Sequence, residues 1–247
     1  GSEMCIRDSH KESANEHKVV KGYHFISITS VDSALNYDQD ELDWLDGEIQ
    51  KAIADAPDKP VFVLGHPHAA DTVYGSTTGW GKDILNTVFD KYPQVVYFSG
   101  HSHYPLDDER SIYQGNYTAI GTSSLNYLEM EPGKDQGIHP DGVYDNAQAL
   151  YMEIYEDKVD LERMDIVNQC KVKEEDWVLN LPLNKDTFTY TSARADEREA
   201  PAFDADDKVT VDEIGASSCV ITFDQAKHSD FTHSYRIRVT NEDTGKE

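Results

Sequence analysis

The chain has 247 residues, enough to bury a substantial core in one large domain or in one medium domain with a smaller one attached. Asp and Glu number 47 against 22 Lys and Arg, a net charge of −25 that would repel nucleic-acid backbones and anionic membrane surfaces. No apolar run approaches the ~20 residues needed to cross a bilayer, so we expect neither nucleic-acid backbone binding nor membrane embedding.

The first nine residues, GSEMCIRDS, have neither a basic segment nor an apolar stretch and so do not form a secretory signal. Gly1-Ser2 resembles the pair left by tag cleavage, and residues 3–9 resemble a translated adaptor at the end of an assembled bacterial metagenomic fragment. We interpret residues 1–9 as a non-native leader and leave them out of the fold prediction.

The first half of the remaining chain alternates between strand and helix patterns. Residues 19–29 are rich in β-branched and aromatic side chains around a Lys-Gly pair, which predicts a hairpin. Apolar residues recur at helical spacing over 42–53, which predicts an amphipathic helix. The short apolar run 60–64 predicts a buried strand, and Gly65-His66 follows it directly.

A second helix is predicted over about 82–91, and the apolar strand 95–98 then ends at Ser99-Gly100-His101. The order helix, strand, helix, strand favours an α/β sheet, in which ligand sites gather at the carboxyl ends of strands. Four more strands are predicted, at 111–114, 117–122, 149–155 and 158–165.

The C-terminal part changes character. Residues 181–207 are polar and charged, which predicts an exposed linker between a first domain, 10–180, and a second, 208–247. The second domain contains three alternating segments, VTVDEI, SCVITF and YRIRVT, which predict three strands of an all-β sandwich. Because a complete sandwich of this kind has about seven strands, we expect a truncated module whose uncovered apolar face allows self-association.

The strongest chemical signal is the pair of histidines in Gly100-His101-Ser102-His103, placed directly after a predicted strand. Residues i and i+2 of an extended segment project to the same side, so both imidazoles would face one site. Gly65-His66 follows another predicted strand in the same way, which predicts a metal site where the two strand ends converge. In the alternative interpretation these histidines are solvated or packed. The other histidines lack this context and are interpreted as structural or exposed: His10, His17, His24, His139, His228 and His233.

Four segments, PVFVLGHPH, TVYGSTTGWG, FSGHSHYPLDDERSIYQG and IGTSSLNY, occur in this order within residues 19–127. Together they resemble the calcineurin-like metallophosphoesterases, in particular bacterial multidomain members. The resemblance implies an α/β chain: a partial metallophosphoesterase β-sandwich flanked by helices, and then a truncated all-β sandwich module similar to a fibronectin type III repeat. It also implies two divalent ions, Mn, Fe or Zn, and hydrolysis of a small phosphoester by phosphatase or phosphodiesterase chemistry.

Matched residue by residue, the resemblance implies that His66 and His101 bind one metal ion and that His103 binds the other. His68 has no secure counterpart, and we leave it outside the ligand set. Three loop aromatics could line the pocket, although aromatic residues in loops more often pack: Tyr74, Trp80 and Tyr127.

The family's other metal ligands lie in Asp-x-His, Gly-Asp and Gly-Asn-His segments, and beyond residue 9 this sequence has none of them. No catalytic residue is therefore assigned. We interpret the chain as the C-terminal part of a hydrolase whose parent is secreted or at the cell surface. Alone it is expected to hold metal at partial occupancy at most and to be inactive.

Two alternatives stay open. One is a noncatalytic secreted or cell-surface binding protein, in which the histidine loops are structural. The other is a single structural zinc site, with Asp107 or Asp108 as the fourth ligand.

Overall fold

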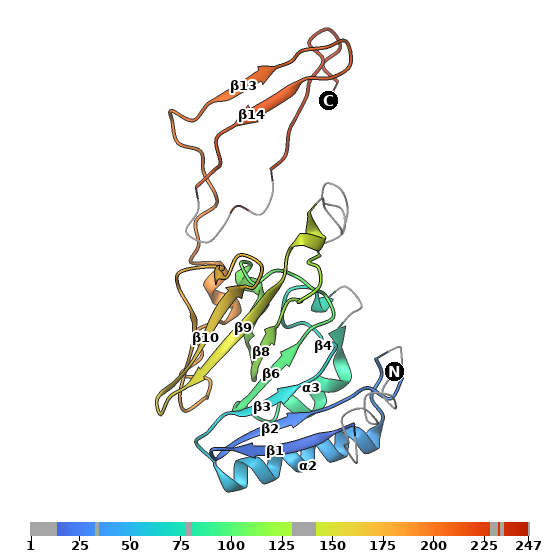
Figure 1. Ribbon diagram of the computed structural model, residues 1–247, viewed down its shortest axis with the longest axis vertical. Coiled ribbons are helices and arrows are strands. Elements are labelled where there is room, and N and C mark those ends of the chain that lie inside the picture. The colour runs from blue at the N-terminus through green and yellow to red at the C-terminus, as the bar shows by residue number, and fades with distance from the viewer. Residues whose placement is uncertain are drawn as a thin grey trace. The chain divides into compact units, whose positions relative to one another are not determined.

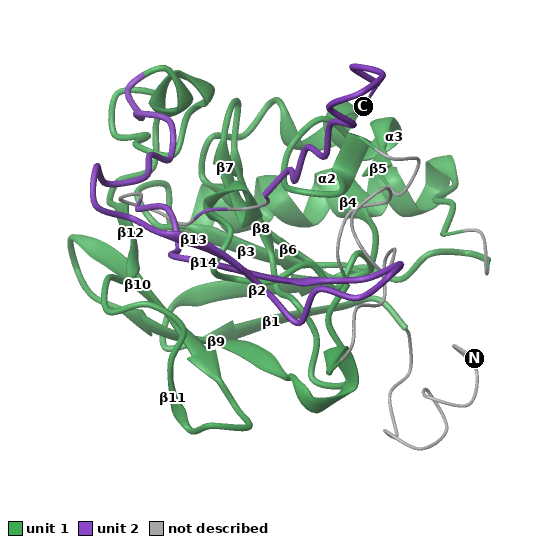
Figure 2. Cartoon of the chain, turned by 90° about the horizontal axis from the view of Figure 1, so that it is seen from above, with its two compact units in different colours: residues 1–196 green, residues 197–247 purple. Residues whose placement is uncertain are grey.

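The computed structural model describes residues 14–32, 35–77, 81–129, 142–227, 232 and 235–246. The predicted leader, 1–9, and Trp80 lie outside these residues. The chain divides into two compact units, Gly1–Asp196 and Glu197–Glu247, shown in two colours in Figure 2.

The first unit is a mixed α/β structure with more strand than helix (Figure 1). Its first half contains β1 (Glu16–Val20), β2 (Tyr23–Ser27), α2 (Gln39–Asp55), β3 (Val61–Leu64), β4 (His68–Ala69), β5 (Gly81–Lys82), α3 (Asp83–Phe89) and β6 (Val95–Ser99). Its second half contains β7 (Ile112–Gln114), β8 (Thr118–Gly121), β9 (Gln148–Ile154), β10 (Lys158–Asp165), β11 (Cys170–Lys171) and β12 (Trp177–Asn180).

The larger sheet of this unit has the strand order β1-β2-β3-β6-β8-β7. Its four inner strands pair in parallel, and the edge strands β1 and β7 are antiparallel to their neighbours. A second sheet places β10 between β9 and β12, all antiparallel. The carboxyl ends of β3, β6 and β8 therefore lie at one edge of the larger sheet.

The larger sheet is buried on both faces. On β3, Val61 and Val63 pack with α2 and α3, whereas Phe62 packs with β10 and β12 on the opposite face. Side chains alternate between the faces of a strand, so a continuous apolar run is needed where both faces are covered. The result is a sandwich-like arrangement in three layers: helices, larger sheet and smaller sheet (Figure 1).

The structure confirms the predicted elements of the first unit. The hairpin of β1 and β2 turns at Lys21 and Gly22, whose φ angles of 52° and 77° are left-handed. Helix α2 begins after Asp38, whose side chain accepts a hydrogen bond from the Glu41 amide. The helix buries Leu42, Leu45, Ile49 and Ala52. No helix in the described part of the chain is both long and apolar enough to cross a membrane.

The structure differs from the predicted linker, residues 181–207, over its first half. Leu183 is buried, and Phe188 and Tyr190 pack against the core between the two sheets. The Arg194 guanidinium donates to the carbonyls of Glu109 and Ile112. A few apolar side chains in a polar segment thus hold it on the first unit, and the boundary falls after residue 196 instead of after 180.

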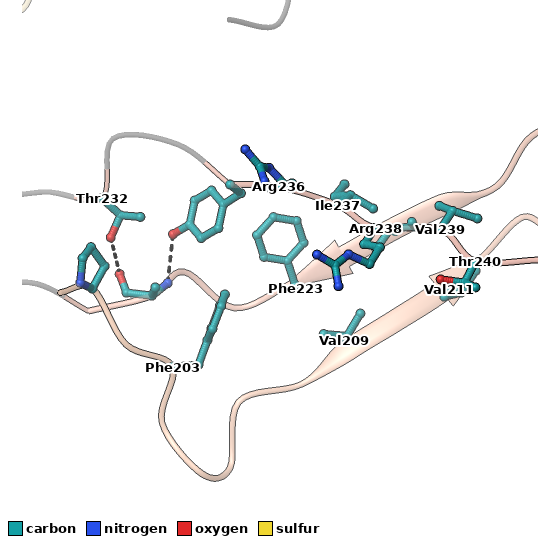
Figure 3. Close-up of a pocket in the computed structure, with 14 residues that line it drawn as sticks. Phe203, Val209, Val211, Phe223, Thr232, Arg236, Ile237, Arg238, Val239 and Thr240 are labelled. Carbon is teal, nitrogen blue, oxygen red and sulfur yellow. Dashed lines mark hydrogen bonds between the residues drawn. The ribbon is translucent and has the colours of Figure 1, made fainter. Parts of the chain in front are cut away.

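Among its described residues the second unit contains two strands in place of the three predicted for 208–247: β13 (Val209–Asp212) and β14 (Val220–Phe223). The third predicted strand, 235–240, forms no strand; its side chains line an apolar groove of about 870 Å³ within this unit (Figure 3). Tyr235 packs against Phe203 and Phe223, with ring centroids 6.0 and 4.9 Å away. Most of the apolar side chains in this unit stay exposed.

A chain of hydrogen bonds joins the first hairpin to α2. Glu48 accepts from His17 Nδ1 at 2.6 Å, His17 Nε2 meets His24 Nδ1 at 2.8 Å, and His24 Nε2 lies 3.1 Å from Asp55. Glu48 and Asp55 are two helical turns apart and so share one face of α2. The two imidazoles therefore link the first hairpin to both carboxylates on this face of the helix.

We predict that Glu48→Gln lowers the free energy of unfolding by about 1–3 kcal/mol at neutral pH, because a partly buried charged acceptor is lost. Burial alone would raise the pKa of Glu48, but hydrogen bonds from His17 and Lys51 outweigh it and lower the pKa. A lowered carboxyl pKa means that its stabilisation is present above the ordinary value of about 4.3 and is lost as the pH falls through the lowered value.

Urea unfolding from pH 7 to pH 3 measures this difference. The gap between the natural chain and Glu48→Gln is expected to close on acidification. Glu16→Gln is the control, because Glu16 pairs with the exposed Lys18 and such pairs contribute about 1 kcal/mol at most. A gap that does not change with pH would contradict the prediction.

Candidate functional site

Two neighbouring parallel strands run directly into the histidine segments. Strands β3 and β6 are in register, with Leu64 opposite Phe98. The pairing continues beyond the strands, because the Gly65 amide donates to the Phe98 carbonyl at 3.0 Å and the Gly100 amide donates to the His66 carbonyl at 3.1 Å. The backbone thus delivers His66 and His101 side by side at the carboxyl edge of the sheet.

The imidazoles of His66 and His101 meet. Nε2 of His66 lies 3.1 Å from Nδ1 of His101, and the two rings are almost perpendicular, at 77°. Two nitrogen ligands of one tetrahedral zinc ion, each about 2.1 Å from it, lie about 3.4 Å apart. The observed spacing is compatible with two ligands of a shared ion, and it is also compatible with a direct hydrogen bond between the two rings.

His103 lies close to this pair but apart from it. Its ring packs on Tyr127, with centroids 4.5 Å apart, and its buried Nδ1 has no hydrogen-bond partner among the described residues. No third His, Cys, Asp or Glu ligand atom in the described ranges lies within 4.8 Å of both paired nitrogens. The described residues therefore offer two ligands at one position and a separate single histidine.

The surroundings of His66 and His101 favour the neutral form of each imidazole. Burial lowers the pKa of His66, and the neighbouring charge of His103 lowers it further. Burial also lowers the pKa of His101, with added effects from His66, His103 and Lys82. A metal ion binds the neutral imidazole, so lowered pKa values favour coordination at neutral pH.

His68 is placed differently from the other three histidines. Its side chain is fully buried, with Nδ1 2.7 Å from Ser99 Oγ and Nε2 2.8 Å from Ser102 Oγ. Burial lowers its pKa to about 3, and the nearby His101 and His66 add to this effect. Both of its nitrogens are engaged by serine hydroxyls.

The zinc alternative finds no support in the described residues, because neither Asp107 nor Asp108 joins a group of three ligand atoms. Asp108 is buried and accepts two hydrogen bonds from the Arg110 Nε and one from its Nη2. The only such group in the described part of the chain is an exposed acidic cluster of the second unit, Asp204, Asp206 and Asp207. Lys227 forms an ion pair with Asp204 there.

Two of the predicted pocket aromatics, Tyr74 and Tyr127, lie in the described residues and pack against other rings. Tyr74 stacks on Tyr104, with ring centroids 4.0 Å apart, and the Arg110 guanidinium lies 3.8 Å from its centroid. Tyr127 packs on His103 and Tyr144. A separate hollow of about 370 Å³ opens at the ends of β3, β6 and β8, lined by Leu64, Phe98, Thr122, Ser123, Ser124, Leu125, Gln148, Ala149, Leu150 and Met152.

Sequence reasoning missed the two serines that hold His68. Ser99 and Ser102 flank the Gly100-His101 pair. This position next to a predicted ligand was the only sequence feature that could have pointed to them. Serine is too common in loops for that feature to single them out. Only the packing of β4 beneath the loop shows what they contact.

No protein-family model matches this chain, and no curated protein is found to be similar to it. The geometry of the site therefore stands without support from a relative.

The loop that carries Ser102 is packed closely enough to exclude one added methyl group. Gly75 has φ +90°, and a Cβ there would lie 2.8 Å from Ser102 Cβ and 2.9 Å from the Tyr104 ring. Gly142 has φ +78° with nothing within 4 Å, so Gly142→Ala suffers the backbone strain without the clash. We predict that Gly75→Ala loses about 1–3 kcal/mol more stability than Gly142→Ala. Equal losses in urea unfolding would contradict this packing.

Proposed function

We propose that this chain supplies the histidine ligands of a metal-dependent phosphoester hydrolase resembling the calcineurin-like metallophosphoesterases. The observation that carries the proposal is the 3.1 Å approach of His66 Nε2 and His101 Nδ1 from the ends of adjacent parallel strands. The separate position of His103, with an orphaned buried Nδ1, agrees with a ligand for a second ion.

The residues fit only part of a dinuclear site. Three histidines suit Mn, Fe or Zn, but the described residues place no carboxylate within 4.8 Å of both paired nitrogens of His66 and His101. A bridging carboxylate normally compensates two adjacent divalent ions. We therefore propose partial metal occupancy at most and no turnover by this chain alone.

Bound divalent ions would neutralise phosphoryl oxygens and lower the pKa of a coordinated water. The chain's own part is to present imidazole nitrogens from the edge of the sheet. Its net charge of −25 would otherwise repel a phosphoester, so small anionic substrates need those ions to reverse the local potential.

The second candidate function is noncatalytic binding by a secreted or cell-surface protein. The observation that favours it is the open groove of the second unit, where Arg236 and Arg238 accompany exposed Val209, Ile237 and Val239 (Figure 3). In that case the histidine pair is held only by a hydrogen bond and takes up no metal.

Metal content measured by plasma mass spectrometry after incubation with Mn²⁺ or Zn²⁺ separates the two functions. The natural chain is expected to retain metal, and a His66→Ala, His101→Ala double variant to lose it. Asp204→Asn with Asp207→Asn is the control, because it disables the acidic cluster of the second unit and should leave retention unchanged. Metal held equally by the chain and the histidine variant would reject the phosphoesterase proposal.

We also predict that the chain with Mn²⁺ does not measurably hydrolyse p-nitrophenyl phosphate or its bis ester, because no carboxylate of the described residues joins the histidine pair. Turnover that disappears in His101→Ala would contradict this expectation and show that the histidines suffice.

A further inference from the structure

We propose that His68 is a positioning residue, which holds the 99–103 loop so that His101 faces His66. This inference rests on the proposed function for its purpose, although the contacts that carry it do not depend on a metal. His68 is fully buried on β4, below the two histidine segments, and takes no part in the proposed ligand set.

His68 joins both sides of the loop. Its Nδ1 lies 2.7 Å from Ser99 Oγ, and its Nε2 lies 2.8 Å from Ser102 Oγ. These two serines enclose Gly100 and His101, so one imidazole fixes the residues on either side of a proposed ligand. Its own position is fixed by its neighbour, because the Tyr97 hydroxyl donates to the Pro67 carbonyl at 2.5 Å.

The surrounding hydrogen bonds determine the tautomer of His68. The Ser99 hydroxyl donates to the Ile120 carbonyl at 3.4 Å, so it accepts from Nδ1–H of His68. A neutral imidazole then has a free lone pair on Nε2, which accepts from the Ser102 hydroxyl. Ser102 Oγ in turn accepts from the Tyr104 amide at 3.5 Å. Each bond has one donor and one acceptor, which makes the bridge directional.

The loop needs such a support because its backbone is strained. His101 and His103 have φ angles of 58° and 53°, in the left-handed region that non-glycine residues rarely adopt. Such conformations persist where the surrounding structure over-determines them. Ser102 lies between the two strained residues. Its hydrogen bond to His68 therefore holds the backbone at the point where relaxation of the strain would turn both imidazoles away from the site.

Two isosteric variants separate the halves of this bridge. An asparagine amide can reproduce only the Nδ1 contact, to Ser99, and a glutamine amide only the Nε2 contact, to Ser102. Because Ser102 lies between His101 and His103, we expect His68→Asn to weaken Co²⁺ binding about tenfold or more and to shift the cobalt absorption bands. His68→Gln is expected to restore most of both. Ser102→Ala, a milder change, should reproduce the effect of His68→Asn and serves if that variant does not fold.

The control is Val88→Ala, which opens a small cavity in the buried face of α3 and lowers the melting temperature while leaving the sequence of the 99–103 loop and its hydrogen bonds to His68 unchanged. Its cobalt spectrum should match that of the natural chain. If the natural chain binds Co²⁺ and all His68 and Ser102 variants bind it and absorb in the same way, the positioning role is overturned.

Backbone amide NMR of the metal-free chain distinguishes this failure from a failure of the proposed function. His68→Asn should shift the amides of 100–103 and speed their hydrogen exchange, whereas Val88→Ala should not. If the natural chain binds no Co²⁺ but this response appears, the phosphoesterase proposal fails and the positioning role stands. If the amides of 100–103 do not respond, the positioning role fails whatever the metal result.

Discussion

The parallel pairing of β3 with β6 is the constraint on which the candidate site depends. The two strands are in register to their last residues, and backbone hydrogen bonds continue the pairing through Gly65 and Gly100. A slip of one residue would turn every side chain to the other face. It would then bury His66 or His101 in a core layer instead of leaving both at the sheet edge.

That register is itself fixed by burial on both faces. Val61, Val63 and Tyr97 pack with the helices, and Phe62 and Val96 pack with the smaller sheet. Neither layer can be satisfied in another register, because each strand alternates between two apolar environments. The smaller sheet, far along the chain, therefore contributes to the position of the histidines. Residues 181–196 extend this layer, with Tyr190 accepting from the Val178 amide and its carbonyl accepting from the Gln114 amide.

The second unit shows what happens when a strand pattern lacks a partner layer. β13 and β14 pair with each other, but Val209, Val211 and Val220 remain exposed. Alternating polar and apolar residues at 235–240 match a strand as well as β13 does, yet this segment forms no ladder among the described residues. The alternation of polar and apolar residues predicts which face of a strand is apolar. A sheet forms only where the backbone N–H and C=O groups of that strand also find hydrogen-bond partners.

The sequence by itself determined the elements of the first unit and the location of the chemistry. Continuous apolar runs end at Gly65-His66 and at Gly100-His101, and the period of burial on α2 follows from Leu42, Leu45 and Ile49. These are local properties, set by side-chain periodicity and by the residues that end each run. Only the tertiary structure decided which nitrogens meet, that His103 stays apart from the pair, and that His68 is buried between Ser99 and Ser102. Contacts between segments about 35 residues apart depend on strand order and register, and the spacing of residues along the chain does not encode either.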